Sequence, residues 1–331
     1  MSSVDIVVPC YRYGCFLREC VESVLSQEGV DARVLIIDDA SPDDTPEVAA
    51  ELYNKSSKVT FVRHSANKGH IATYNEGIDW ASADYCMILS ADDYLLPGAL
   101  NRAVTLMEAH PEVGFTYGRV VTLDQRGSVS SVSMDTEATG WQVMTGLAFI
   151  ELSGARNIVP TPTAIVRTQL QKRVGGYRPE LPHSGDLEMW LRLAAHGSVG
   201  VTEAYQAAYR RHAGNMSLRY MADRWYPDLQ QRKAAFNYFL EDCANVLPHP
   251  GHIRQRFSKL LAQDALDFAN GAFNDGDSSS FDKLYNFALQ EYPAITWSST
   301  WMKLLVKRTL GIPRWQTLQP CIARHRVTSC Q

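Results

Sequence analysis

The sequence predicts an α/β protein with a mainly parallel sheet flanked by helices, followed by an α-helical C-terminal region. Short apolar runs alternate with segments of helical period through the first 120 residues, and such continuous runs are typical of strands covered on both faces. Strand–helix–strand alternation at this spacing requires right-handed crossovers and therefore parallel strands. From about residue 221 the apolar pattern is helical. We expect an α/β domain over residues 1–220 and a helical region over residues 221–331.

The α/β part begins with four strands and four helices in alternation. Leu17 and Val21 fall on one face of the first helix. Asp44 or Thr45 can cap the second helix, ahead of Pro46 in its first turn. The predicted strands cover residues 5–9, 33–37, 59–63 and 85–89. The first, third and fourth helices are predicted over residues 16–26, 71–81 and 97–110.

The later elements have weaker patterns. Residues 127–139 are polar, and we expect them to form a loop. A strand is expected over residues 163–166, a short helix over 186–196 and an edge strand over 204–209, with the domain boundary near 215–222. Further helices are predicted over residues 225–245, 253–272, 280–290 and 300–310.

Composition narrows the class of protein. Of the 331 residues, 45% are hydrophobic and 21% are charged, which is ordinary for a globular chain. A net charge of −4 argues against general nucleic-acid binding, and seven cysteines without a CxxC pair argue against a structural zinc site. No apolar run reaches the roughly 18 residues of a membrane span, and the N-terminus lacks the pattern of a signal peptide. We expect a cytoplasmic protein with reduced cysteines.

Acidic pairs follow two of the predicted strands. Asp38 and Asp39 come after the second strand, and Asp92 and Asp93 follow the fourth. The carboxyl ends of parallel strands open into one crevice, where ligands bind. Neighbouring carboxylates repel unless a proton or a cation neutralises them, and aspartate oxygens are ligands that Mg²⁺ and Mn²⁺ prefer. Turn and helix-cap chemistry is the alternative for both pairs.

Two common phosphate-binding loops are missing from the sequence. The segment after the first strand, from Pro9 to Gly14, does not match GxGxxG, and the chain contains no GxxxxGK[ST]. Without a glycine cradle, the charge of a diphosphate must be met in another way. A divalent metal held by Asp92 and Asp93 would meet it.

The ordered set of motifs resembles inverting nucleotide-sugar glycosyltransferases of family 2, which have the Rossmann-like GT-A fold. The resemblance covers about residues 4–217, and its strength lies in the order of several individually weak motifs. They are residues 7–11 (VVPCY), 22–27 (ESVLSQ), 37–45 (IDDASPDDT), 67–69 (NKG), 74–77 (YNEG), 89–93 (LSADD), 186–192 (DLEMWLR) and 211–217 (RHAGNMS).

The resemblance implies a nucleotide site on the loops after the first three strands. Tyr11 would lie against the nucleobase, and Asp39 would accept a hydrogen bond from a ring N–H. Pro9 would contribute its carbonyl, since it has no N–H. Asn67 and Lys68 belong to the same nucleotide-binding set.

The resemblance also implies a metal site. Asp92 would bind ribose or metal, and Asp93 would coordinate the metal that bridges the diphosphate, either Mn²⁺ or Mg²⁺. Ser90 departs from the fuller Asp-x-Asp motif, which leaves the division of roles between the two aspartates open. His212 is a candidate contact for the metal or the diphosphate, and an ordinary surface histidine is the alternative.

Asp186 is the implied general base, which takes the proton of the acceptor hydroxyl as it attacks the anomeric carbon. Gly185 stands where many family members have a second acid. Glu188, on the same short helix, is the rival candidate, and helix capping is the alternative role for Asp186.

The implied function is transfer of a sugar from a nucleotide-diphosphate sugar, UDP-sugar favoured, to a glycan or lipid-linked acceptor with inversion. Bacterial polysaccharide or glycolipid assembly is the implied setting. A nucleotidyltransferase is one alternative, although it would need a glycine-rich basic loop after the first strand. A degenerate sugar-binding module is the other, and the intact acidic positions count against it.

The C-terminal 40 residues are basic. Residues 292–331 contain six Lys and Arg and no Asp or Glu, so the first 291 residues carry −10. Within residues 297–315, Trp297 and Trp301 accompany Lys303 in a helix-compatible stretch, which suits an interfacial helix on an anionic membrane. A helix packed on the catalytic domain is the alternative. We therefore expect peripheral contact with the inner face of a membrane and leave a homo-oligomer open.

Overall fold

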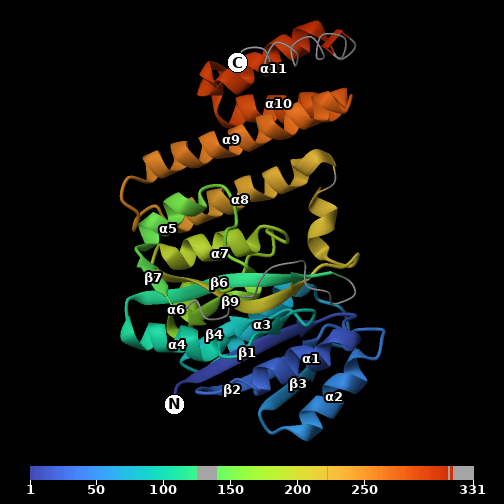
Figure 1. Cartoon of the computed structure of the whole chain (residues 1–331), viewed down its shortest axis with the longest axis vertical. Coiled ribbons are helices and arrows are strands. Elements are labelled where there is room, and N and C mark those ends of the chain that lie inside the picture. Colours follow the sequence, from blue (N-terminus) through green and yellow to red (C-terminus); the bar gives the residue numbers. More distant parts are fainter. Residues whose placement is uncertain (125–139, 222, 312–313, 316–331) are drawn as a thin grey trace, which may run out of the picture. The chain divides into compact units, whose positions relative to one another are not determined.

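A computed structural model describes residues 1–124, 140–221, 223–311 and 314–315 of the chain (Figure 1). The loop expected over residues 127–139 lies outside these ranges. The chain divides into two compact units. The first contains Met1–Asn215 and Asn237–Pro248, and the second contains Met216–Phe236 and His249–Gln331. No helix of the described ranges is long and apolar enough to cross a membrane.

The first unit begins with four parallel strands joined by helices, as the sequence predicts. β1 pairs with β2 and β4, and β2 pairs with β3, all in parallel. The strands are β1 (Ser3–Cys10), β2 (Asp31–Asp38), β3 (Val59–Arg63) and β4 (Tyr85–Ile88), and the helices between and after them are α1 (Gly14–Leu25), α2 (Thr45–Lys55), α3 (His70–Trp80) and α4 (Ala99–Ala109). The predicted α/β fold class is confirmed.

The sheet continues as a mixed sheet beyond β4. The described residues form strands in the order β3-β2-β1-β4-β8-β6-β9-β5, with β7 also paired to β9. β8 runs antiparallel to β4 and β6, whereas β9 runs parallel to β6. These strands are β5 (Tyr94–Leu95), β6 (Val113–Leu123), β7 (Trp141–Met144), β8 (Ile165–Arg167) and β9 (Ser198–Arg210). The edge strand expected over residues 204–209 is wrong, because β9 is longer and lies inside the sheet between β6 and β5.

The other helices of the first unit lie between the later strands. They are α5 (Gly146–Ser153), α6 (Thr168–Val174) and α7 (Gly185–Ala194), with a 3-10 turn, η1, at Thr161–Thr163. The second unit holds η2 (Met216–Met221), η3 (Asp223–Trp225), α9 (Pro250–Asn274), α10 (Ser278–Glu291), η4 (Pro293–Trp297) and α11 (Ser299–Leu310), and α8 (Tyr226–Cys243) runs through both units. The predicted C-terminal helices are therefore confirmed.

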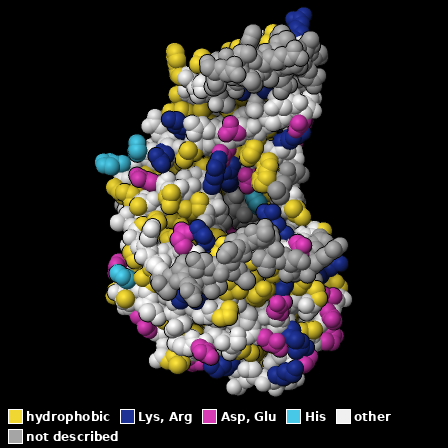
Figure 2. Space-filling view, in the orientation of Figure 1, with side chains coloured by type: hydrophobic (Ala, Val, Ile, Leu, Met, Phe, Trp, Pro, Cys, Tyr) yellow, Lys and Arg dark blue, Asp and Glu magenta, His cyan; other side chains and the backbone are white. Residues whose placement is uncertain are grey.

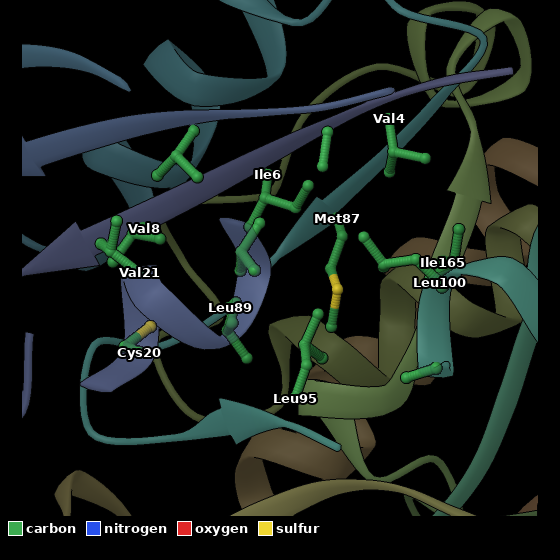
Figure 3. Close-up of a cluster of buried hydrophobic side chains, with 14 of the residues drawn as sticks. Val4, Ile6, Val8, Cys20, Val21, Met87, Leu89, Leu95, Leu100 and Ile165 are labelled. Carbon is green, nitrogen blue, oxygen red and sulfur yellow. The ribbon is translucent and has the colours of Figure 1, made fainter. Parts of the chain in front are cut away.

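β1 is apolar on both faces because helices cover both. Val4, Ile6 and Val8 alternate along one face and are fully buried with Val21 of α1 and Leu100 of α4 (Figure 3). On the other face, Val7 packs with Leu35 and Ile37 of β2. Each such side chain stabilises the fold by roughly 1.5–3 kcal/mol when fully buried. This core fixes the strand ends that carry the site.

The outer surface of α1 and α2 is charged rather than apolar. Figure 2 shows Lys and Arg side chains interspersed with Asp and Glu side chains at the lower right, over these two helices. There Glu51 pairs with both Arg18 and Lys55. Exposed pairs of this kind contribute about 0–1 kcal/mol, so they keep this face solvated more than they stabilise it.

Candidate functional site

The carboxyl ends of β1, β2 and β4 meet at one edge of the sheet. Cys10 at the end of β1 is level with Asp38 of β2, and Val7 is level with Ile88 of β4. The loops that follow therefore share one region, which brings the two acidic pairs to the same edge as the sequence predicts.

Asp39 is held by the loop after β3. Its Oδ1 accepts the backbone N–H of Lys68 at 2.7 Å, and its Oδ2 accepts that of Gly69 at 2.9 Å. His64 Nδ1 lies 2.7 Å from the same Oδ1, and Asn67 Nδ2 donates to the Asp39 carbonyl at 3.1 Å. A carboxylate oxygen accepts up to two hydrogen bonds, so Oδ2 keeps an acceptor position for a ligand.

His64 extends this network away from the strand ends. It is buried, and its Nε2 lies 3.0 Å from Glu76 Oε2 of α3. Lys68 Nζ donates to the same Glu76 oxygen at 3.1 Å. Sequence reasoning did not select His64, because only its position after β3 marks it. The structure makes it the link between Asp39 and Glu76.

Asp38 and Tyr11 differ sharply in exposure. The Asp38 side chain is fully buried, where its Oδ1 accepts the Ser41 N–H at 2.9 Å and its Oδ2 lies 3.1 Å from Arg63 Nε. Asp38 therefore shapes the turn after β2, the alternative role weighed for this pair. Tyr11 follows the end of β1, next to Pro9 and Cys10, and is 43% exposed.

Asp92 and Asp93 point to different partners. Asp92 Oδ2 lies 3.0 Å from His212 Nε2, whereas Asp93 Oδ1 accepts the Arg210 backbone N–H of β9 at 3.0 Å. Burial raises the pKa of both carboxyls, and the charge of Asp92 raises the pKa of Asp93 further, well above its ordinary value. A cation at this pair would relieve that unfavourable charge.

The ring of His212 packs against aromatic side chains at the start of α1. Its ring lies edge-on to Tyr13 at 5.3 Å and stacks on Phe16 at 5.6 Å between centroids. The Gly214 N–H donates to His212 Nδ1 at 3.1 Å. Because Nδ1 accepts, the neutral ring carries its proton on Nε2 and donates it to Asp92. Among the described residues, no group of three or more His, Cys, Asp and Glu side chains is arranged to hold a metal.

Asp186 lies in the first turn of α7 and is partly exposed. Thr161 Oγ1 donates to its Oδ2 at 2.8 Å, and the Tyr177 hydroxyl also donates to this carboxylate. Burial raises the pKa of Asp186 above its ordinary value, although both hydrogen bonds favour the ionised form. Its hydrogen-bond partners are side chains of η1 and of the loop before α7 rather than the backbone N–H groups of α7, which argues against a helix-capping role.

The loop that presents Tyr177 is fastened to α3. Asn75 Oδ1 accepts the Tyr177 N–H at 2.6 Å, and Asn75 Nδ2 donates to the Tyr177 carbonyl at 2.9 Å. At Gly176 an added Cβ would lie 2.4 Å from Asn75 Oδ1, so only glycine allows this approach. Tyr74 packs edge-on against Tyr177 at 5.3 Å between centroids. Thus α3 positions a hydrogen-bond donor of Asp186.

Glu188 is a correction to the sequence interpretation. Its side chain is fully buried, and Oε2 lies 2.7 Å from Arg192 Nη2, with Arg178 Nε 3.7 Å from Oε1. Arg192 also donates to the carbonyls of Val174 and Gly176. Full burial and the two arginines argue against this carboxylate as the group that takes a proton from an acceptor. Glu188 instead anchors the loop that carries Tyr177.

Comparison with known proteins shows the class to which the chain is similar. The family model of Glycosyl transferase family 2 matches residues 5–162. An uncharacterized glycosyltransferase of Methanocaldococcus jannaschii is 23% identical over 197 residues, which cover 59% of this chain and 66% of that protein. The GalNAc(5)-diNAcBac-PP-undecaprenol beta-1,3-glucosyltransferase of Campylobacter jejuni is 28% identical over 132 residues, 39% of this chain and 41% of that protein.

Solved structures share the fold. S. aureus TarS 1-349 in complex with UDP-GlcNAc has a TM-score of 0.63 at 19% identity, covering 87% of this chain and 79% of that one. The mannosyltransferase PcManGT of Pyrobaculum calidifontis, in complex with GDP-Man and Mn²⁺, has a TM-score of 0.54 at 16% identity, covering 93% and 86%. The chain is a glycosyltransferase. Its residues 5–162 are a family 2 domain on the GT-A fold.

Proposed function

We propose that the chain transfers a sugar from a nucleotide-diphosphate sugar to an acceptor hydroxyl, with inversion at the anomeric carbon and Asp186 as the general base. The proposal rests on the orientation and the raised pKa of the Asp186 carboxyl. Its carboxylate is partly exposed and is oriented by Thr161 and Tyr177. Burial raises its pKa above the ordinary value of an aspartate, which is the direction that makes a carboxylate a better base.

The proposed step is one displacement. Asp186 takes the proton of the acceptor hydroxyl while that oxygen forms a bond to the anomeric carbon from the face opposite the nucleotide. The bond between this carbon and the diphosphate oxygen breaks, and the nucleoside diphosphate leaves with the electron pair. Burial and then the charges of Asp186 and Asp92 raise the pKa of Tyr74, which supports a base and a donor-side carboxylate close to one ring.

On the nucleotide side, Asp39 is the residue proposed to accept the base N–H through Oδ2, and Tyr11 to lie against the base. Pro9 would offer its carbonyl at the end of β1. Asn67 and Lys68 act through Asp39, since both bond to it. UDP-sugar is the favoured donor, supported by the UDP-GlcNAc bound to TarS, and the GDP-Man bound to PcManGT makes guanosine the next nucleotide to try.

A divalent cation, Mn²⁺ or Mg²⁺, is proposed at Asp92. The donor set fits, because Mg²⁺ is commonly held by one or two carboxylates together with substrate phosphates. The cation would neutralise charge on the departing diphosphate. Asp93 is bonded to β9 and His212 donates to Asp92, so we assign positioning roles to both rather than the metal contacts that the sequence suggested.

The acceptor is proposed to be a glycan or a lipid-linked glycan, in bacterial polysaccharide or glycolipid assembly. The name of the Campylobacter jejuni relative, which specifies transfer to an undecaprenol-linked glycan, supports this class of acceptor. A lipid-linked acceptor would place the enzyme at the inner face of a membrane.

A panel of nucleotide sugars, assayed for nucleotide release with Mn²⁺ and with EDTA, tests the proposal. Asp186→Asn should abolish transfer while calorimetry shows UDP binding close to that of the parent chain. Glu47→Gln, at an exposed acid on α2, is the matched control and should leave both unchanged. Full transfer by Asp186→Asn removes Asp186 from the mechanism. Failure to cleave any sugar of the panel counts against the function itself.

A further inference from the structure

α11 buries one of its faces within the second unit. Leu304 is fully buried, and Trp301 stacks on an aromatic ring of α10 with centroids 6.2 Å apart. Lys307 lies on the same face, where its Nζ donates to Asn270 Oδ1 at 2.6 Å and to Asn274 Oδ1 at 2.7 Å. These contacts hold α11 beside α9 and α10 (Figure 1).

The opposite face of α11 is apolar but exposed. Met302, Leu305 and Val306 recur at the spacing of one helix face and are 52%, 37% and 51% exposed. Thr309 continues this row, and its hydroxyl donates to the Val306 carbonyl at 2.9 Å, which leaves its methyl group for the surface. We call these four residues the α11 stripe. Trp297, just before the helix, is 88% exposed. A contiguous row of exposed apolar side chains rimmed by charged residues is typical of an interaction surface.

The surrounding charge indicates what kind of partner fits. By helical spacing, Lys303 and Arg308 flank the α11 stripe on its two sides, and both are exposed, as is Arg314. Lys303 has no ion-pair partner in the described part of the chain, whereas Arg308 pairs with Asp282 at 3.0 Å. Residues 292–331 contain no acid. An anionic lipid surface offers negative headgroups above an apolar interior, which complements both features.

We propose that the α11 stripe and Trp297 form a docking surface for anionic lipid membranes. The stripe enters the boundary between headgroups and acyl chains, while Lys303, Arg308 and Arg314 face the lipid phosphates. Insertion of apolar side chains and attraction between positive charges and anionic lipids each give only weak membrane binding. Together they give reversible peripheral binding. The docking surface belongs to the second unit, whereas the proposed donor and base residues belong to the first, so its test requires no transfer reaction.

Sedimentation of the full chain with vesicles tests this docking. Binding is expected to vesicles of phosphatidylcholine with phosphatidylglycerol, to be weak with phosphatidylcholine alone, and to decrease with salt. Lys303→Gln should weaken partitioning roughly fivefold, and Leu305→Ser roughly tenfold. Leu152→Ser, at a leucine of α5 that is 61% exposed, is the matched control and should bind like the parent chain. All three sites are exposed, so melting temperatures should stay unchanged.

Three results overturn the proposal. They are equal binding to neutral and anionic vesicles, unchanged binding by Leu305→Ser, and an equal loss of binding by Leu152→Ser. Analytical ultracentrifugation adds a fourth. A chain that self-associates without lipid, separates into monomers on Leu305→Ser and binds no vesicles would show the α11 stripe to be a contact between copies.

Discussion

Replacing Arg192 by methionine tests the structural role of Glu188. Glu188 Oε2 lies 2.7 Å from Arg192 Nη2, and the second guanidinium, that of Arg178, is 3.7 Å from Oε1. Because Glu188 is fully buried, the variant leaves a carboxylate without solvent and with only its more distant partner. Breaking a buried pair in this way costs about 3–5 kcal/mol, which corresponds to a fall of roughly 10 °C in melting temperature for a unit of this size.

Thermal melting followed by circular dichroism measures this loss, and transfer per folded molecule is measured beside it. The double variant Glu188→Leu/Arg192→Met is the control, because apolar residues can replace a buried ion pair with little cost. It should recover the part of the loss that comes from the unpaired carboxylate, while the carbonyls of Val174 and Gly176 still lack Arg192 as a donor. Glu188→Gln should melt at a lower temperature and keep its transfer rate when folded. A Glu188→Gln chain that melts like the parent chain but transfers no sugar would refute the structural role and assign Glu188 to the reaction.

Three further predictions concern the site. Because the pKa of Asp186 is raised and a base acts when ionised, kcat/KM should be full above that pKa and fall about tenfold per pH unit below it. Thr161→Val should move the midpoint of this pH profile upward, because Asp186 loses a hydrogen bond to its ionised form. A midpoint at or below about 4 in the parent chain, which is the ordinary carboxyl range, would contradict the prediction. His64→Phe should weaken UDP binding roughly tenfold in calorimetry, because Asp39 loses one of its donors; an unchanged Kd argues against it. Asp92→Asn should remove the Mn²⁺-dependent part of UDP affinity, whereas Asp93→Asn, whose amide oxygen can still accept the Arg210 N–H, should keep it. The reverse pattern assigns the metal to Asp93.

The strands that the sequence predicts best are those buried on both faces. β1 and β2 read as unbroken apolar runs because helices cover both sides of the sheet there. β6 lacks such a run, since Gly114 and Gly118 interrupt it. An added Cβ at Gly118 would lie 2.6 Å from Gln206 Cγ of β9, so this glycine permits a close approach between two strands far apart in sequence. The local sequence pattern therefore does not predict this contact between β6 and β9.

The site residues also divide into those that a local pattern predicts and those that only the packing of distant segments brings together. Asp39 and Asp92 are predictable because a strand end places them, and strand ends are visible in the sequence. Thr161 and Tyr177 reach Asp186 only through the packing of η1 and of the loop before α7. Nothing in the spacing of these residues indicates that they share one carboxylate, and His64 is hidden in the same way.

The two acidic pairs show why a motif alone leaves roles open. Adjacent acids can still have different partners: Asp38 ends β2 and Asp39 follows it, whereas Asp92 and Asp93 lie in the turn after β4. Only in the first pair does one carboxylate close local structure, because Asp38 accepts the Ser41 N–H three residues on, whereas Asp39 reaches the loop after β3. In the second pair both carboxylates reach the end of β9 and the residues after it, Asp93 through the Arg210 N–H and Asp92 through His212. Turn chemistry therefore describes Asp38 alone, and the part of the −10 charge that can act on a donor is smaller than the sequence implies.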